Sequence, residues 1–489
     1  MRYLTELETT RPDTVPRYAA ALPGAQATVL GRLWGALARE PLPGLRSRTS
    51  DSSCLTVTFD NGHHVTGPDA AGIIACDLPE LTLDGRDVTD PATLVRCLWP
   101  GPDGDRLATE VSGSVDGLAL ARAHAPSGAG TTRDSTWYEQ SVIDGHPVHP
   151  CSRSRPGMSV AEVLAYAPEH RPEFELPLVA VARERMHTPA PDWPLTDGPR
   201  ILLPVHPWQH DHILPRYGLI AAGSIPARPL MSLRSVATEQ WQIKMSIDVQ
   251  LTSAVRGLSH PTMHNGPALS RVLPDLPGLT FLRETHAAGI DPHLGAVLRQ
   301  PPERHLRAGQ VAVPLSALTT STTPGIDFAT VITATVPPLL RMLDRGIALE
   351  AHGQNTLLVL DENQQPHGLL YRDVGGIHLS PHRFGIHPPL RGTIVNDDPL
   401  VLHSKLAAAM TMTLAGLIHA ADDDSLWAYA AHTIDTTYAD LPADHWNRHH
   451  HALFHAPTLP VKAYTTKRLA DDPRTDLWCR TPNPYTAHR

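Results

Sequence analysis

The chain has 489 residues, including 48 prolines, 34 glycines and 29 histidines, and its 50 acidic and 41 basic residues give a formal net charge of −9. This length predicts two to four structural units, and 41% apolar residues can form a sizeable core. The charged fraction of 19% excludes a disordered polyelectrolyte. The negative balance argues against binding nucleic acid through overall charge.

The cysteines and the apolar segments bear on the compartment. The five cysteines are widely spaced without a CxxC pair, which argues against a disulfide scaffold or zinc ribbon and favours a reducing cytoplasm. Glu6 and Glu8 stand where a signal peptide needs an apolar run. The longest apolar stretch, 406–421, contains His419 and is predicted to be too short to span a bilayer. We therefore expect a soluble, cytoplasmic protein with no membrane partner.

The first 135 residues or so read as a mostly helical unit. Pro23-Gly24 is predicted to break the chain, and Leu55 to Phe59 alternates like a strand that ends in the turn Asp60 to Gly62. Asp90-Pro91 resembles a helix N-cap followed by proline at the first helical position. Helical spacing predicts helices at 25–39, 91–99 and 106–125.

Beyond a predicted linker at 127–130, strands cluster without regular crossover helices. Residues 200–205 read as a buried strand, and strict alternation over 242–251 predicts one half-buried strand with Lys244 on its polar face. Residues 356–360 and 368–371 predict a hairpin between long helices at 328–343 and 404–422. This order favours an α+β fold over a doubly wound α/β fold.

The strongest chemical signal brackets that hairpin. Glu350, Asn355 and Asp373 are oxygen donors of the kind Mg²⁺ prefers, and His352 stands beside them. The pattern resembles the loop of small-molecule phosphotransferases, in which an aspartate follows His-Gly. Here Gln354 occupies that position, and an amide cannot accept a hydroxyl proton as a base must. A polar turn with a salt-bridged strand end is the structural alternative.

A second signal is basic. Ser232, Arg234 and Lys244 are followed by Thr252 and Arg256, and cations with nearby hydroxyls suit a triphosphate or a polycarboxylate. No Walker loop or GxGxxG accompanies them. The alternative is a solvated strand that carries surface cations.

Histidine-proline pairs and a histidine cluster form the remaining signals. His146 and His149 lie near Cys151 without a fourth zinc ligand at a familiar spacing, so a zinc site is not predicted there. In the cluster from His445 to His455, His445/His449 and His451/His455 would each share a helix face. We expect a solvated or interface helix.

Taken together, the motifs resemble those of the NRPS-independent siderophore (NIS) synthetases, the aerobactin-synthetase-like enzymes. Seven short motifs occur in order: 145–157 (GHPxHP with a basic run), 206–209 (HPWQ), 232–234 (SxR), 244–256 (K…TSxxR), 350–355 (ExHxQN), 372–376 (RDxGG) and 462–469 (K…RL). The resemblance covers about residues 130–489. Two departures are Arg153, where the family usually has lysine, and a chain that is short for the family.

The resemblance implies a hand-like fold with a thumb at 1–135, fingers at 136–325 that carry an antiparallel sheet, and a helix-rich palm at 326–489. It implies an AMP-forming ligase that adenylates a carboxylic acid such as citrate and joins it to an amine, hydroxylamine or alcohol. The implied cofactors are ATP and Mg²⁺, and a homodimer is implied. A phosphotransferase and a non-catalytic ATP- or carboxylate-binding protein are the alternatives.

The resemblance also implies residue roles. Lys244, Arg256 and His352 would be catalytic, and Glu350, Asn355 and Asp373 would hold the metal. The implied ATP contacts are Ser232, Arg234, Lys244, Arg256, His352, Gln354, Asn355 and Asp373. The implied acid-substrate contacts are His146, Arg153, Thr252, Arg256, His352 and Lys462.

Overall fold

The structure is a computed structural model that describes residues 2–51, 53–70, 72–74, 80–125, 133–187, 192–252, 254–320, 322–323, 325–470 and 477–487. The linker predicted at 127–130 lies outside these residues. The described chain mixes helices with several mainly antiparallel sheets, so the α+β class is confirmed.

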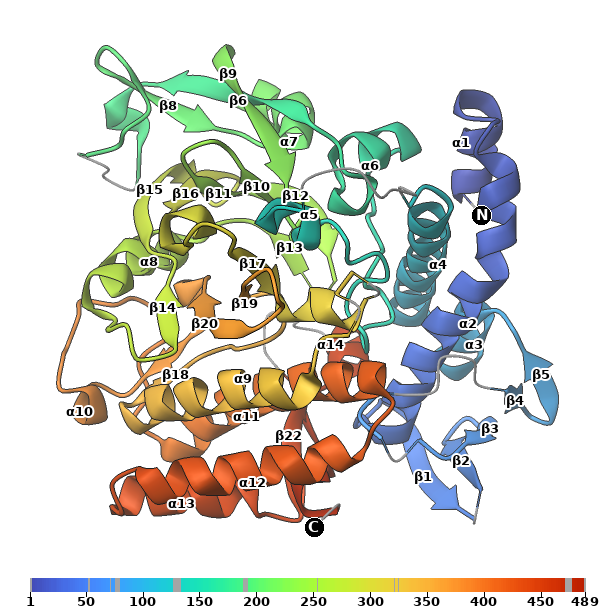
Figure 1. The fold of residues 1–489 in the computed structure, drawn as a ribbon. Helices are drawn as coiled ribbons and strands as arrows, with labels where there is room; N and C mark the ends of the chain where they lie inside the picture. Colours follow the sequence, from blue (N-terminus) through green and yellow to red (C-terminus); the bar gives the residue numbers. More distant parts are fainter. Residues whose placement is uncertain are drawn as a thin grey trace.

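The N-terminal part packs helices against a small sheet, at the right of Figure 1. Its helices are α1 (Arg2–Thr10), α2 (Val15–Arg39), α3 (Pro91–Leu98) and α4 (Pro102–Ala123). Its sheet has the antiparallel order β1 (Leu45–Ser50), β2 (Cys54–Phe59), β3 (His64–Pro68), β4 (Leu81–Leu83) and β5 (Arg86–Val88). The side chain of Asp90 caps α3 as predicted, accepting from the N–H groups of Ala92 and Thr93.

The predicted break at Pro23-Gly24 is wrong, because Pro23 lies inside α2. Proline removes one backbone donor, but the buried Leu33 and Trp34 farther along α2 belong to the N-terminal core and hold the helix in place. Packing of the apolar face therefore outweighs the local penalty.

The central part is an eight-stranded antiparallel sheet. Its order is β15 (Glu284–Asp291), β16 (Leu294–Arg299), β11 (Gln242–Met245), β10 (Ser235–Ala237), β9 (Ala221–Pro229), β6 (Phe174–Val181), β8 (Arg200–Pro204) and β7 (Thr196–Asp197). The nearby helices are α5 (Ser135–Glu139), α6 (Val160–Tyr166), α7 (Pro207–His212) and α8 (His260–Val272).

The single strand predicted at 242–251 is corrected to two strands. β11 ends at Met245, and β12 (Ile247–Leu251) pairs instead with β13 (Ala254–Arg256). Between them, Ser246 donates from its N–H to the Gly295 carbonyl and from its hydroxyl to the Pro292 carbonyl. β11 is also buried on both faces, so Lys244 does not lie on a solvated face.

The C-terminal part surrounds a four-stranded sheet of order β14 (Leu279–Phe281), β20 (Pro366–Tyr371), β19 (Thr356–Leu360) and β17 (Val311–Pro314). β19 and β20 form the predicted hairpin, and β14 pairs parallel with β20. The helices of this part are α9 (Phe328–Asp344), α10 (Pro381–Phe384), α11 (Pro399–Ala421), α12 (Ser425–Asp440), α13 (His445–Phe454), α14 (Tyr464–Leu469) and α15 (Pro484–Ala487). Small strand pairs are β18 (Ile347–Ala348) with β21 (His378–Leu379), and β22 (Thr458–Lys462) with β23 (Trp478–Pro482).

Helix α11 corrects the prediction that the apolar stretch is too short to cross a membrane. With 23 residues, it is long and apolar enough to do so by length and composition. However, 72% of its most apolar 18-residue window is buried inside the protein, as in a core helix.

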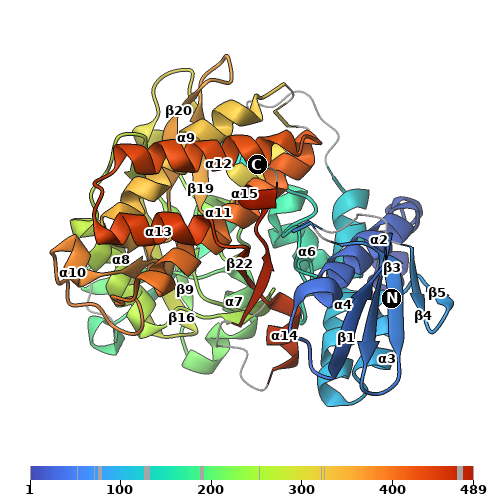
Figure 2. The same cartoon turned by 90° about the horizontal axis from the view of Figure 1, so that it is seen from below.

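Helix α14, late in the chain, packs against the N-terminal part, as the view from below in Figure 2 shows. Arg468 of α14 bonds to both carboxylate oxygens of Glu110 on α4, and both side chains are buried. The carboxylate of Glu40 accepts from the N–H groups of Thr465 and Thr466 in the first turn of α14. These contacts place β22 and α14 against the N-terminal part.

Candidate active site

A cavity of about 1210 Å³ lies where the N-terminal, central and C-terminal parts meet. All thirteen residues to which the family resemblance gave a role line it: His146, Arg153, Ser232, Arg234, Lys244, Thr252, Arg256, Glu350, His352, Gln354, Asn355, Asp373 and Lys462. Among the described lining residues, thirteen are Lys or Arg and three are Asp or Glu. A chain of net charge −9 thus concentrates cations in one cavity.

Lys244 and Asp373 form an ion pair on the wall. Lys244 reaches from the buried β11, and its Nζ lies 2.5 Å from Oδ1 of Asp373, which follows β20. Burial alone would raise the pKa of Asp373, but Lys244, Arg299 and Arg234 lower it below its usual value. Asp373 has a left-handed backbone with φ of 67°, a costly conformation that concentrates at functional sites.

Glu350 is the second carboxylate of the cavity. Its Oε1 lies 2.6 Å from Nζ of Lys462 and 3.2 Å from Nζ of Lys405. Burial alone would raise the pKa of Glu350, but the two ammonium groups lower it well below its usual value. Both carboxylates are therefore ionised at neutral pH.

The loop between β12 and β13 presents Arg256. Its Nη2 donates to Oγ1 of Thr252 at 2.7 Å, and Thr252 itself has a left-handed φ of 55°. Nη1 of Arg234 donates to the backbone carbonyls of Arg256 and Gly257 at 3.2 and 3.3 Å, so Arg234 supports the backbone that presents Arg256. Burial and then the charge of Arg256 lower the pKa of Arg234 to about 10, which leaves it charged.

The loop before β19 is held tightly. Nδ2 of Asn355 lies 3.3 Å from Nε2 of His352, and burial lowers the pKa of His352, so this imidazole is neutral at pH 7. A Cβ on Gly353 would overlap the backbone and side chain of Ser316, so only glycine allows this close approach.

A buried ion pair at the wall of the cavity connects these segments. Nη1 and Nη2 of Arg372 lie 2.5 and 2.9 Å from the two carboxylate oxygens of Glu139 on α5. Arg372 also donates to the carbonyl of Gln354, and Glu139 accepts from the N–H of Met231, next to Ser232. The sequence motif contained Arg372, but no local pattern pointed to Glu139.

His146 and Arg153 lie at the N-terminal side of the cavity. Burial lowers the pKa of His146 to about 3, and its ring contacts that of Tyr464, with centroids 4.9 Å apart. Arg153 donates to the carbonyls of Ile143 and Val142 and pairs with buried Glu169. These contacts favour a structural role for Arg153, and the substrate contact implied for it stays a prediction.

The sequence reasoning gave no role to several cations of the cavity, among them Lys405 and Lys467. Lys405 pairs with Glu350 from within α11, and Lys467 lines the cavity from α14. A lone lysine in an otherwise apolar helix was the available signal for Lys405, since an unpaired buried ammonium is costly.

Two protein families match two successive parts of the chain. Residues 134–320 match the IucA / IucC family, and residues 328–477 match a family described as ferric iron reductase FhuF-like transporter. Staphyloferrin A synthase of Staphylococcus aureus is 27% identical over 441 residues, 72% of this chain and 73% of that protein. L-2,3-diaminopropanoate–citrate ligase of the same organism is 24% identical over 438 residues, 71% of this chain and 74% of that protein.

Two solved structures, among others, share the fold. The petrobactin biosynthesis protein AsbB of Bacillus anthracis superposes with a TM-score of 0.80 at 18% identity, covering 100% of this chain and 98% of that one. The ATP-bound aerobactin synthetase IucA of Klebsiella pneumoniae gives a TM-score of 0.72 at 20% identity, covering 94% of this chain and 99% of that one. At these identities the likeness concerns the fold.

Proposed function

Because the chain belongs to the IucA/IucC family of NIS siderophore synthetases, which are ATP-dependent ligases, we propose that its cavity adenylates one carboxylate of a citrate-like polycarboxylic acid and transfers the acyl group to an amine. The observation that carries this proposal is the excess of cations in one cavity of an acidic protein, which suits a triphosphate beside a polycarboxylate.

The triphosphate would bind along Ser232, Arg234, Lys244 and Arg256. Ser232 and Arg234 come directly before β10, Lys244 comes from β11 and Arg256 from β13, and all four line the cavity. Arg256 would neutralise the charge that develops as a carboxylate oxygen approaches the α-phosphorus. In that step the new C–O–P bond forms and the bond to pyrophosphate breaks.

A magnesium ion fits the donor set. Glu350 and Asp373 are ionised, and among the described residues each has one carboxylate oxygen with no protein partner, while Asn355 adds an amide oxygen. Hard cations prefer these oxygen ligands. When bound, Mg²⁺ would neutralise phosphate charge and favour departure of pyrophosphate.

The acid would occupy the side of the cavity near His146, Thr252 and Lys462, with neutral His352 against the activated carboxyl. An amine nitrogen would then attack the acyl carbon, lose a proton and release AMP. Citrate is the acid named in the relative L-2,3-diaminopropanoate–citrate ligase. Positioning of the two reactants in one cavity would supply much of the rate.

Gln354 favours this chemistry over phosphoryl transfer to an alcohol. Its side chain is an amide, which cannot serve as the base that a phosphotransferase places there. Its backbone carbonyl accepts a hydrogen bond from Arg372. A ligase needs no base at this position.

We also propose that the three parts correspond to the thumb at 1–135, fingers at 136–325 and palm at 326–489. Separate apolar clusters in the N-terminal part, the eight-stranded sheet and the C-terminal part support this division. Trp137 and Leu315 belong to the C-terminal cluster, so residues of the proposed fingers also contribute to the core of the palm. The homodimer and the cytoplasmic location stay predictions.

The test is pyrophosphate release from ATP and Mg²⁺ with a panel of carboxylic acids and hydroxylamine as a substitute nucleophile. Acid-dependent release of pyrophosphate with equimolar AMP is expected. ADP as the product would establish phosphoryl transfer instead. ATP binding without turnover for any acid in the panel would support the non-catalytic alternative.

A further inference from the structure

Three potential metal ligands converge on the surface between α12 and α13, outside the active-site cavity. Nε2 of His451 lies 2.8 Å from Oδ1 of Asp435, and Nε2 of His455 lies 3.0 Å from the same oxygen. The two Nε2 atoms are themselves 3.0 Å apart. Among the described residues, none of α12 or α13 lines the cavity, so this group is separate from the proposed ligase chemistry.

The group is built from two elements. His451 lies in the last turn of α13, and His455 is the residue directly after the helix, four positions on, so that their side chains meet. Asp435 comes from α12. Tyr438, one turn after Asp435, stacks on His451 with ring centroids 4.8 Å apart and planes inclined by 26°. This contact sets the orientation of the imidazole, as the surroundings of metal-binding histidines commonly do.

The spacing is close to that of a coordinated ion. Ligand atoms bound tetrahedrally at about 2.0–2.1 Å from zinc lie about 3.3 Å from one another. The three atoms here all lie within 4.8 Å of one another, and the pairs above need to open by only a few tenths of an ångström. The side chains of His451, His455 and Asp435 are 35%, 31% and 37% exposed, so an ion can reach them from solvent.

We propose that Asp435, His451 and His455 bind a divalent transition-metal ion of the zinc class, with water in the fourth position, and that the ion clamps α13 to α12. Two imidazoles and one carboxylate are donors that such ions accept and that Mg²⁺ does not favour. The site is therefore chemically distinct from the carboxylates of the cavity.

Helix α13 offers a matched control. His445 and His449 have the same spacing on the same helix, with stacked rings whose centroids are 6.2 Å apart. No carboxylate joins them in a ligand group among the described residues. His449→Gln therefore removes a histidine from α13 without touching the proposed site, whereas His451→Gln and Asp435→Asn each remove one ligand.

The experiment uses untagged full-length protein and Zn²⁺ in competition with a chromogenic chelator. Wild type and His449→Gln should bind one equivalent with affinities within twofold of each other, and His451→Gln and Asp435→Asn should bind at least tenfold more weakly. Zinc should also raise the thermal midpoint of wild type but not of His451→Gln. Equal zinc binding by wild type and His451→Gln, or an equal loss in His449→Gln, would overturn the proposal.

Cobalt provides a second readout that reports the ligands themselves. Co²⁺ should give visible absorption bands of a low-coordinate site in wild type, and these bands should be absent from Asp435→Asn while circular dichroism stays unchanged. Bands that persist in Asp435→Asn would exclude Asp435 as a ligand.

Discussion

Replacing Glu139 with glutamine tests the inference that the Arg372–Glu139 pair holds the cavity together. Both side chains are almost fully buried, at 4% and 1% exposure, and the pair makes two parallel hydrogen bonds. Glutamine retains one acceptor but removes the charge, which leaves the guanidinium uncompensated inside the protein. Breaking a buried pair in this way costs about 3–5 kcal/mol, and the retained acceptor places the expected loss near the lower value.

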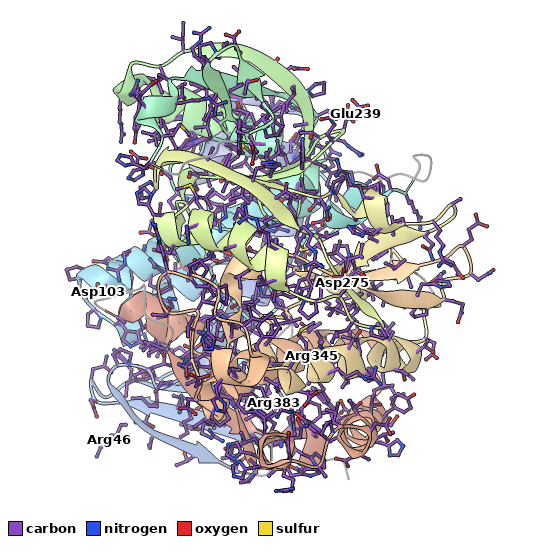
Figure 3. The ribbon with its side chains drawn as sticks, turned by 90° about the vertical axis from the view of Figure 1, so that its left-hand side faces the viewer. Arg46, Asp103, Glu239, Asp275, Arg345 and Arg383 are labelled. Carbon is purple, nitrogen blue, oxygen red and sulfur yellow. The ribbon has the colours of Figure 1, made fainter. Side chains whose placement is uncertain are left out.

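The assay is urea unfolding followed by tryptophan fluorescence, since Trp137 lies on α5 two residues from Glu139. Glu239→Gln is the control, because Glu239 is exposed between β10 and β11 and is not among the described residues that line the cavity; Figure 3 labels it at the outer edge of the molecule. Adding Arg372→Met to Glu139→Gln should recover part of the loss, because it removes the unpaired charge. A loss below about 1 kcal/mol, or a double variant less stable than the single one, would refute the reasoning.

Three further predictions concern the active site and the core. Arg256→Ala should lower the rate of pyrophosphate release by about 10²–10³-fold without changing the thermal midpoint, and the control Arg46→Ala should change neither. Activity of Arg256→Ala within about threefold of wild type would show that Arg256 does not contact the transition state. Gly376→Ala places a Cβ 2.6 Å from Oε2 of Glu350 and should displace that carboxylate. The Mg²⁺ concentration that gives half-maximal activity should therefore rise several-fold. An unchanged Mg²⁺ titration would show that Glu350 does not bind the metal. Burial lowers the pKa of His450 from 6.5 to about 3, so below pH 6.5 the unfolded chain binds a proton that the folded protein does not. The contribution of His450 to the free energy of unfolding should therefore be fully present above pH 6.5 and should be lost as the pH drops toward 3. His450→Leu should make that fall shallower in thermal unfolding between pH 6.5 and 4.5, and an identical slope would contradict the assignment.

The elements that follow from local pattern were predictable. The capped helix after Asp90, the hairpin of β19 and β20 and the helix α9 depend on side-chain periodicity and turn residues, which a sequence displays directly. Where neighbours override the local preference, prediction was wrong: Pro23 stays helical, and the alternating run through Ser246 divides between two sheets. Both outcomes depend on packing partners far along the chain.

The sequence by itself identified the candidate active-site residues, because motifs such as ExHxQN and RDxGG are short, contiguous and in a recognisable order along the chain. Only the tertiary structure decided which charges meet. Lys244 pairs with Asp373 across 129 positions, and Arg372 pairs with Glu139 across 233. Likewise, helical spacing indicated that His451 and His455 share a face, but Asp435 joins them only because α12 lies alongside. Ion pairs and ligand groups depend on distance in space, and no periodicity within one segment reports the position of another.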